Sequence, residues 1–235
     1  MPINRFFCAQ KEKKFINLNE SFLSRLKLFE NKEGEDHLAK MLESIPEFME
    51  DREHILGEGD TAQVFPDKTG KFCIKEIVIN PKDILPTHLN NVIKEAKIQD
   101  KVHVLGVKTP DVIFAAITKN GKQFLAMEII KSKNLEEAIN HPEYFPKNFN
   151  KESFIEKLSE MVGILNKNKI YHRDLKPKNI LFDEDGGPVI IDFGVSVRGS
   201  FLFRGNPFKE FDSETNETVS FMTDIERVEE LRNIL

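Results

Sequence analysis

The chain has 235 residues, of which 40% are hydrophobic and 31% are charged, and its formal net charge is −5 at pH 7. This length allows one compact domain or two small lobes, and the hydrophobic content is sufficient for a sizeable core. The negative charge argues against a nucleic-acid-binding protein, which needs a basic surface to contact phosphates.

Cysteine content and hydropathy exclude two further classes. Cys8 and Cys73 are the only cysteines, too few for a disulfide framework or a cysteine-rich zinc site. The sequence contains no apolar run of membrane-spanning length, and its first residues lack the apolar segment of a cleaved secretory signal. We therefore expect a cytosolic protein with no membrane span, and secretion by a route without a cleaved signal remains open.

Residues 1–50 are predicted to form a helical N-terminal extension. Apolar residues recur at helical spacing in "SFLSRLKLF" and "HLAKMLESI", with breaks near Gly34 and Pro46. These helices either pack on the following domain or serve as a docking or regulatory segment.

Residues 51–131 are predicted to form a β-rich lobe. Strands are expected in "HILGEG", "AQVF", "KFCIKEIVI", "DVIFAAIT" and "QFLAMEII", separated by Gly-containing turns. Between the third and fourth strands, "PTHLNNVIKEAKIQDKVHVL" has the apolar spacing of a helix.

Residues 132–235 are predicted to form a mainly helical lobe. "NLEEAINHPEY" and "SFIEKLSEMVGILNKN" have helical spacing, and "NILFD" and "PVIID" flank the turn "EDGG" as a short strand pair. A last helix is expected in "MTDIERVEELRNIL", with an apolar face formed by Ile225, Val228, Leu231 and Ile234. The fold class is therefore α+β, with two lobes and a cleft between them.

The segment "YHRDLKPKNILF" has the spacing of a phosphoryl-transfer loop. Its residues match H-R-D-x-K-x-x-N, and the segment lies between a predicted helix and a predicted strand. Asp174 is expected to accept or aim the hydroxyl nucleophile, Lys176 to neutralise the γ-phosphate, and Asn179 to bind Mg²⁺. A match at so many fixed positions is a specific signal for phosphoryl transfer.

Three further signals, each weak when taken alone, accompany this loop in the sequence. "IIDFG" places Asp192 eighteen residues after Asp174, as a second Mg²⁺ ligand. Lys75, in a predicted strand, and Glu95, in the following helix, are expected to form an ion pair that holds the lysine over the nucleotide phosphates. Taken singly, Lys75 could extend to the surface and Glu95 could be a solvated helix charge.

The turn "LGEGDTAQVF" is the third of these signals. Glycines in such a turn let backbone N–H groups approach phosphate oxygens, although two glycines before a strand are often an ordinary hairpin. The expected phosphate-binding residues are Gly57, Glu58, Gly59, Asp60 and Ala62. Ala62 replaces the usual third glycine.

In this order, these motifs resemble the eukaryotic-type protein kinase family over about residues 54–235. The resemblance implies a kinase-like fold, ATP and Mg²⁺ as cofactors, and a serine/threonine hydroxyl of a protein as acceptor, because Lys176 is the form found in serine/threonine kinases. It also implies an adenine site formed by Val64, Cys73, Met127, Glu128, Ile130 and Leu181. Gln99 stands where the family normally has an apolar residue, so the helix that carries it is expected to dock less tightly in the active state.

The region after Gly194 departs from the family pattern. It contains no A-P-E motif. Asp224 stands where the family places an aspartate that binds the backbone of the H-R-D loop; it could instead, or in addition, cap a helix with Thr223. Such a truncated helical lobe resembles compact effector kinases that bacterial pathogens inject by type III secretion, which implies virulence in a host cell and a host ubiquitin-conjugating enzyme or chaperone as partner.

Two alternatives remain open from the sequence, namely a partner-binding pseudokinase scaffold and a small-molecule phosphotransferase. Arg173 is expected to pair with a phosphate on the segment after Gly194. The candidate acceptors there are Ser196, Ser200, Ser213, Thr215, Thr218 and Ser220.

Overall fold

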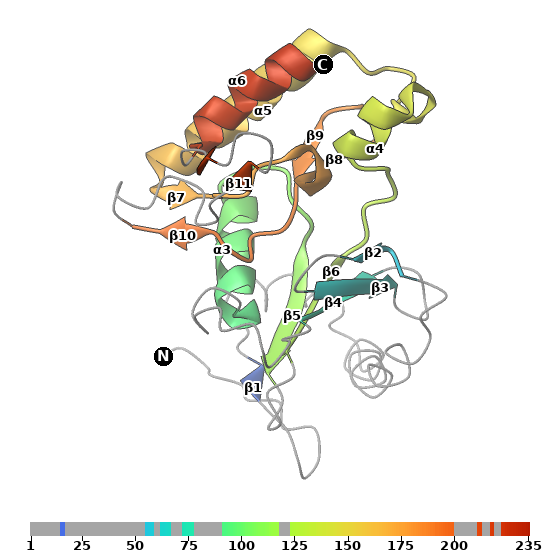
Figure 1. Cartoon of the computed structure of the whole chain (residues 1–235). Coiled ribbons are helices and arrows are strands. Elements are labelled where there is room, and N and C mark those ends of the chain that lie inside the picture. Colours follow the sequence, from blue (N-terminus) through green and yellow to red (C-terminus); the bar gives the residue numbers. More distant parts are fainter. Residues whose placement is uncertain are drawn as a thin grey trace. The chain divides into compact units, whose positions relative to one another are not determined.

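The computed structural model describes residues 15–16, 55–58, 62–66, 72–77, 91–117, 123–199, 211–212, 217–218 and 222–235 (Figure 1). The chain divides into two compact units. The first comprises residues 1–100 and 111–129, and the second comprises residues 101–110 and 130–235. Within the described residues, no helix combines the length and the apolar character needed to cross a membrane.

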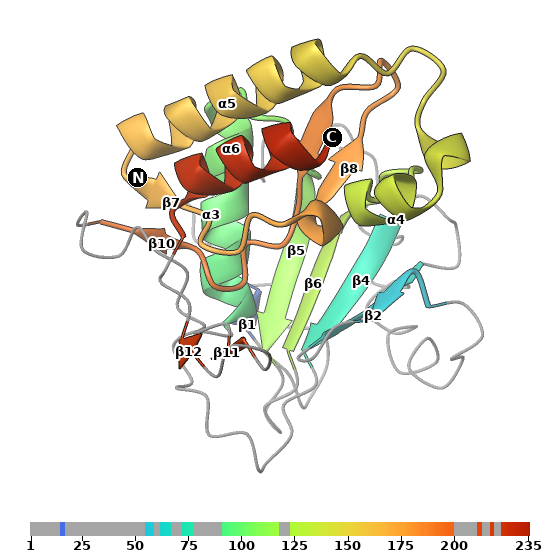
Figure 2. The same ribbon diagram turned by 45° about the horizontal axis from the view of Figure 1, so that its top comes forward.

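The first unit is built around an antiparallel sheet with the strand order β1-β5-β6-β4-β3-β2 (Figure 2). Its strands are β1 (Phe15–Ile16), β2 (Gly57–Glu58), β3 (Ala62–Pro66), β4 (Phe72–Ile77), β5 (Val112–Ile117) and β6 (Gln123–Glu128). Apart from β1, the predicted N-terminal extension lies outside the described residues.

Helix α3 (Val92–Val104) packs on this sheet through its first part. Its residues Val92 and Ala96 join a core cluster with sheet residues that include Ile74, Leu125 and Ala126. Two side chains hold the first turn, because the Asn91 Oδ1 atom accepts the Ile93 amide at 2.9 Å and the Gln123 Oε1 atom accepts the Val92 amide at 3.1 Å. The last residues of α3 belong to the second unit.

The second unit contains helices α4 (Leu135–Asn140), α5 (Lys151–Lys167) and α6 (Asp224–Ile234), with 3-10 turns at Pro142–Tyr144 and Pro177–Asn179. Short strands accompany them: β7 (Ile170–Tyr171), β8 (Ile180–Phe182), β9 (Pro188–Ile190), β10 (Val197–Arg198), β11 (Phe211–Asp212) and β12 (Glu217–Thr218). The predicted α+β class, with strands dominating the first unit and helices the second, is confirmed. The predicted pairing of "NILFD" with "PVIID" is also confirmed, as β8 and β9.

Helices α5 and α6 lie side by side (Figure 1). Helix α5 buries an apolar stripe at helical spacing, which is formed by Phe154, Ile155, Leu158, Met161, Val162 and Leu165. This is the pattern that the sequence predicts.

The apolar face predicted for α6 is wrong in part. Val228 and Leu231 are buried, but Ile225 and Ile234 are 56% and 51% exposed. The reason is the buried side chain of Asp224 at the start of the helix. Since each residue rotates about 100° around a helix axis, an inward-facing Asp224 aligns with Val228 and Leu231 and leaves the two isoleucines on the flanks.

Candidate active site

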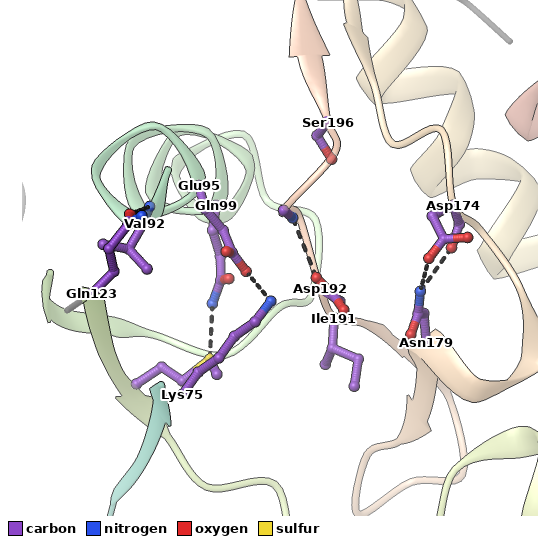
Figure 3. Close-up of polar contacts among 12 residues, drawn as sticks. Lys75, Val92, Glu95, Gln99, Gln123, Asp174, Asn179, Ile191, Asp192 and Ser196 are labelled. Carbon is purple, nitrogen blue, oxygen red and sulfur yellow. Dashed lines mark hydrogen bonds and ion pairs between the residues drawn. The ribbon is translucent and has the colours of Figure 1, made fainter. Parts of the chain in front are cut away.

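The lysine of strand β4 lies inside the first unit. The Lys75 Nζ atom is 2.8 Å from the Glu95 Oε1 atom, and the two side chains are only 8% and 1% exposed (Figure 3). The predicted ion pair is therefore confirmed, and the alternatives of a surface lysine and a solvated helix glutamate are wrong. Because breaking a buried pair is costly, each charge fixes the position of the other.

The sheet register places the candidate nucleotide-binding side chains of this unit on one face. Val64 lies opposite Lys75 on the neighbouring strand, and Cys73 lies opposite Met127. Side chains on one strand alternate between faces, so Cys73 and Lys75 share a face with both partners. The strand pairing thus brings together four residues that are separated by up to 63 positions in the chain.

Gln99 lies beside this group, one helical turn after Glu95. Its side chain is 1% exposed, and its Nε2 atom donates to the Met127 Sδ atom at 3.7 Å (Figure 3). The departure from the family's apolar residue therefore does not leave a polar side chain pointing to solvent. Instead, it joins helix α3 to strand β6.

The remaining candidates of the nucleotide site fall in different places. Gly57 and Glu58 form strand β2, and the Glu58 carboxylate accepts a hydrogen bond from Gln63 at 2.8 Å. Ala62 begins strand β3, whereas Gly59 and Asp60 lie outside the described residues.

At the end of strand β6, the Glu128 amide donates to the Asp111 carbonyl oxygen at 2.8 Å. The second unit contains Ile130, whose carbonyl oxygen accepts the Ser132 amide, and Leu181, which lies on strand β8.

The predicted catalytic loop runs from β7 through the second 3-10 turn to β8. The Asn179 Nδ2 atom donates to the Asp174 backbone oxygen at 2.8 Å and to the Asp174 Oδ2 atom at 2.9 Å (Figure 3). The Lys176 Nζ atom is 2.9 Å from the same Oδ2 atom. The three side chains therefore form one cluster around a carboxylate that is 19% exposed.

Asp224 anchors this loop from helix α6. Its Oδ2 atom accepts the His172 amide at 2.7 Å, and its Oδ1 atom accepts the Arg173 amide at 2.8 Å. Arg173 has φ 72°, a left-handed conformation that is strained for a residue with a side chain. The predicted anchoring role of Asp224 is confirmed, and the two hydrogen bonds hold the loop in its strained form.

Burial shifts the pKa of both charged groups at this anchor. Burial raises the pKa of the Asp224 carboxyl, an effect opposed by the charge of His172 and by the hydrogen bonds from the Arg173 and His172 amides. Burial also lowers the pKa of the Arg173 guanidinium, while the nearby Asp224 raises it.

Thr223 caps the helix that carries the anchor. Its side chain accepts the Glu226 amide and the Glu226 carboxylate accepts the Thr223 amide, which is a complete capping box. We expect Thr223→Ala to lower the free energy of unfolding by about 1 kcal/mol, as measured by urea denaturation. Thr223→Ser keeps the hydroxyl and serves as the control, so an equal loss in both variants would show that the cap is not the cause.

The "IIDFG" segment follows strand β9. Asp192 has φ 65°, and its Oδ1 atom accepts the Gly194 amide at 3.2 Å (Figure 3). The Ile191 amide donates to the Asn179 carbonyl oxygen at 3.0 Å, so the two predicted metal ligands are joined through neighbouring backbone atoms.

These two side chains fit a magnesium ion. Both hydrogen bonds of the Asn179 amide group to Asp174 use its nitrogen, so neither engages the amide oxygen, and an amide oxygen and the Asp192 carboxylate are ligand types that suit Mg²⁺. Among the described residues, no group of three or more His, Cys, Asp or Glu side chains could hold a metal. Mg²⁺ does not need such a group, because it commonly takes one or two carboxylates together with waters and phosphate oxygens.

Ser196 differs from its expected role as a phosphate acceptor. Its side chain is 0% exposed, and its hydroxyl donates to the His172 carbonyl oxygen at 3.0 Å. A buried, bonded hydroxyl is not accessible for phosphorylation. The side chains of the other five candidate acceptors lie outside the described residues.

Comparison with known proteins decides the family. The model of the protein kinase domain matches residues 51–202, which is more than half of the chain. The chain belongs to the protein kinase family. The matched range contains the paired Lys75 and Glu95, the loop around Asp174, and the Asp192 segment.

Curated relatives of this kinase domain include proteins that are serine/threonine kinases by name. CBL-interacting serine/threonine-protein kinase 20 of Arabidopsis thaliana is 27% identical over 148 residues, which cover 61% of this chain and 32% of the relative. CBL-interacting serine/threonine-protein kinase 19 of the same plant is 28% identical over 164 residues, covering 67% and 32%. Sperm motility kinase 3A of Mus musculus is 33% identical over 111 residues, covering 46% and 21%. The chain thus spans about a third or less of the length of these relatives.

Proposed function

We propose that this kinase domain transfers the γ-phosphoryl group of ATP to serine or threonine hydroxyls of a protein. The observation that carries the proposal is the cluster in which Asn179 and Lys176 both contact the Asp174 carboxylate. Phosphoryl transfer depends mainly on positioning and on charge stabilisation, and this cluster offers an oriented carboxylate next to a cation.

In this proposal, Asp174 receives the proton of the acceptor hydroxyl while the hydroxyl oxygen bonds to the γ-phosphorus. The bond from the γ-phosphorus to the β–γ bridging oxygen breaks, and ADP leaves with that oxygen. Lys176 faces the negative charge that develops on the transferred group. The direct contact between Lys176 and Asp174 keeps the carboxylate oriented in the absence of substrate.

Asn179 and Asp192 are proposed to hold Mg²⁺, which when bound neutralises charge on the β- and γ-phosphates. Lys75 is proposed to bind the α- and β-phosphates, and Glu95 keeps its ammonium group in place. Met127 and the backbone of Glu128 and Ile130 are proposed to face adenine, together with Val64, Cys73 and Leu181. The turn at Gly57 and Gly59 is proposed to cover the phosphates.

The acceptor class rests on Lys176 and on the named serine/threonine kinases among the relatives. A pseudokinase scaffold is less well supported, because every position that phosphoryl transfer requires carries the required residue type. A small-molecule phosphotransferase is disfavoured by the same lysine.

The test is incubation of the purified chain with γ-labelled ATP, Mg²⁺ and a generic protein substrate. We expect labelled serine and threonine, and we expect Lys75→Ala to lower kcat by about 10²–10³-fold because one phosphate-binding cation is lost. Lys97→Ala, an exposed lysine on the same helix as Glu95, is the control and should retain wild-type rate.

Each alternative predicts a different result in this assay. A scaffold would bind nucleotide without labelling any protein. A small-molecule phosphotransferase would label aminoglycosides or sugars faster than protein. Either result would contradict the proposal.

We propose further that this kinase acts as an injected bacterial effector in the cytosol of a host cell, where a ubiquitin-conjugating enzyme or chaperone assists it. The support is that the segment between Gly194 and helix α6 contains no A-P-E motif and leads directly to the anchoring Asp224. Phosphosite mass spectrometry with added eukaryotic or bacterial lysate, using Asp174→Ala as the blank, tests this. Equal phosphorylation in both lysates, with no activation by the eukaryotic one, would contradict it.

A further inference from the structure

The loop that carries Asp192 is attached to the catalytic loop on both sides of this residue. Before it, the Ile191 carbonyl oxygen lies 2.9 Å from the Nε2 atom of His172. After it, the Ser196 hydroxyl donates to the His172 carbonyl oxygen at 3.0 Å. His172 is therefore an anchor for both ends of the segment between Ile191 and Ser196.

The segment between these two attachments contains a residue in the left-handed backbone region. Asp192 has φ 65°, a conformation that is uncommon for residues with side chains and that its own Oδ1 atom supports by accepting the Gly194 amide. Such a conformation persists only where the surrounding contacts enforce it. The Ser196 hydroxyl supplies one of these contacts, and the packing of the Phe193 ring against the His172 ring, with centroids 4.8 Å apart, supplies another.

The hydrogen bond of the Ser196 hydroxyl can hold the loop in place because water does not compete for this hydroxyl. Ser196 and His172 are both 0% exposed, so loss of the hydroxyl would leave the His172 carbonyl without this donor in a buried place. The Ser196 amide also donates to the Phe193 carbonyl oxygen at 3.1 Å, which closes the turn after Asp192. Ser196 thus closes the turn through its amide and attaches the turn to His172 through its hydroxyl. Figure 3 shows Asp192 and Ser196 on this segment.

We propose that Ser196 is a positioning residue. Its hydrogen bond to His172 holds the loop that carries Asp192, and thereby keeps the Asp192 carboxylate in its metal-binding orientation. This inference rests on the proposed function for the role of Asp192, but the attachment itself can be tested without catalysis. Nothing in the sequence distinguishes Ser196 from the other candidate phosphate acceptors, because its partner is a backbone oxygen 24 residues earlier.

The first experiment is hydrogen–deuterium exchange of the full chain without nucleotide. We expect Ser196→Ala to speed exchange of the Ile191 and Ser196 amides by about 2- to 10-fold, the range that corresponds to one ordinary hydrogen bond. Peptides from helix α5 provide the internal reference and should not change. Ser196→Cys has a similar size but donates only weakly, so it should behave like the alanine variant.

The second experiment measures the rate against Mg²⁺ concentration at fixed ATP. We expect Ser196→Ala to raise the half-saturating Mg²⁺ concentration by about 2- to 10-fold, because part of the loop population no longer presents Asp192 correctly. Ser159→Ala, at an exposed position on α5, is the matched control and should leave both readouts unchanged.

Three results would overturn the inference. These are wild-type exchange in Ser196→Ala, a uniform rise in exchange that includes α5 with no change in Mg²⁺ dependence, and wild-type behaviour of Ser196→Cys. If the wild-type chain shows no kinase activity, the proposed function fails, and the exchange experiment still decides whether Ser196 fastens the loop.

Discussion

Asp174→Ala is expected to lower kcat by about 10²–10⁴-fold, the range typical of losing a catalytic base. The KM for ATP should change little, since the carboxylate is proposed to contact the acceptor hydroxyl. The fold should persist, because Asn179 keeps its hydrogen bond to the Asp174 backbone oxygen. Initial rates with labelled ATP at saturating substrate, together with urea denaturation, measure both effects.

Two further variants sharpen this experiment. Asp174→Asn keeps a polar side chain of the same shape but cannot accept a proton at neutral pH, so high residual activity would show that Asp174 only aims the hydroxyl. Asp185→Ala removes an exposed carboxylate from the turn between β8 and β9 and should have no effect. An Asp174→Ala enzyme that keeps more than about a tenth of the wild-type rate would contradict the role of a catalytic base.

Asp224→Ala is expected to lower both stability and turnover. It leaves the buried His172 amide and the partly buried Arg173 amide without their acceptor, at a cost of about 1–3 kcal/mol for the buried amide. It also removes the contacts that hold Arg173 at φ 72°, so the catalytic loop should relax toward an unstrained conformation. Urea denaturation and kcat, measured on the same preparation, report the two losses.

Asp224→Asn is the matched comparison for this anchor. It retains one acceptor oxygen, so we expect a loss of stability between those of wild type and Asp224→Ala. Glu229→Ala changes an exposed carboxylate on the same helix and should be neutral for turnover. If Asp224→Ala loses stability but keeps the wild-type kcat in the folded fraction, the anchor is structural and does not position the loop.

Two of the three described non-glycine residues with positive φ in the second unit, Arg173 and Asp192, share one structural cause. Arg173 and Asp192 both have positive φ, and the hydrogen bonds that surround them converge on the catalytic loop. The Asp224 carboxylate accepts hydrogen bonds from the His172 and Arg173 amides, whereas the Ser196 hydroxyl donates to the His172 carbonyl oxygen. The loop is therefore held from helix α6 and from the segment after Asp192.

Much of this kinase domain could be predicted from its sequence, since local patterns carried the signal. Alternating strands, amphipathic helices and Gly-containing turns depend on neighbouring residues, and the H-R-D and D-F-G motifs are contiguous. The ion pair between Lys75 and Glu95 was also predicted, because the two residues occupy positions that form an ion pair in the family that the sequence resembles. For the strands, helices, turns and contiguous motifs, sequence spacing and spatial proximity are directly related.

Other features depended on contacts between distant segments. Spacing alone predicted that Ile225 and Ile234 lie on the buried face of α6. Because the Asp224 side chain points inward and bonds the catalytic loop, the helix is rotated so that both isoleucines are exposed. Spacing also grouped Ser196 with the candidate phosphate acceptors, although burial makes it a donor to His172. Gln99 departs from the family's apolar residue, and only the tertiary structure shows that its side chain is buried and donates to Met127.

By itself, the amino-acid sequence determined the order of the strands and helices and the residue types available for phosphoryl transfer. The tertiary structure alone decided which polar side chains are buried and which atoms they contact. The physical reason is that a hydroxyl, amide or carboxylate has the same local pattern whether it faces water or protein. Its role depends on the partner that replaces water, and that partner usually comes from a remote part of the chain.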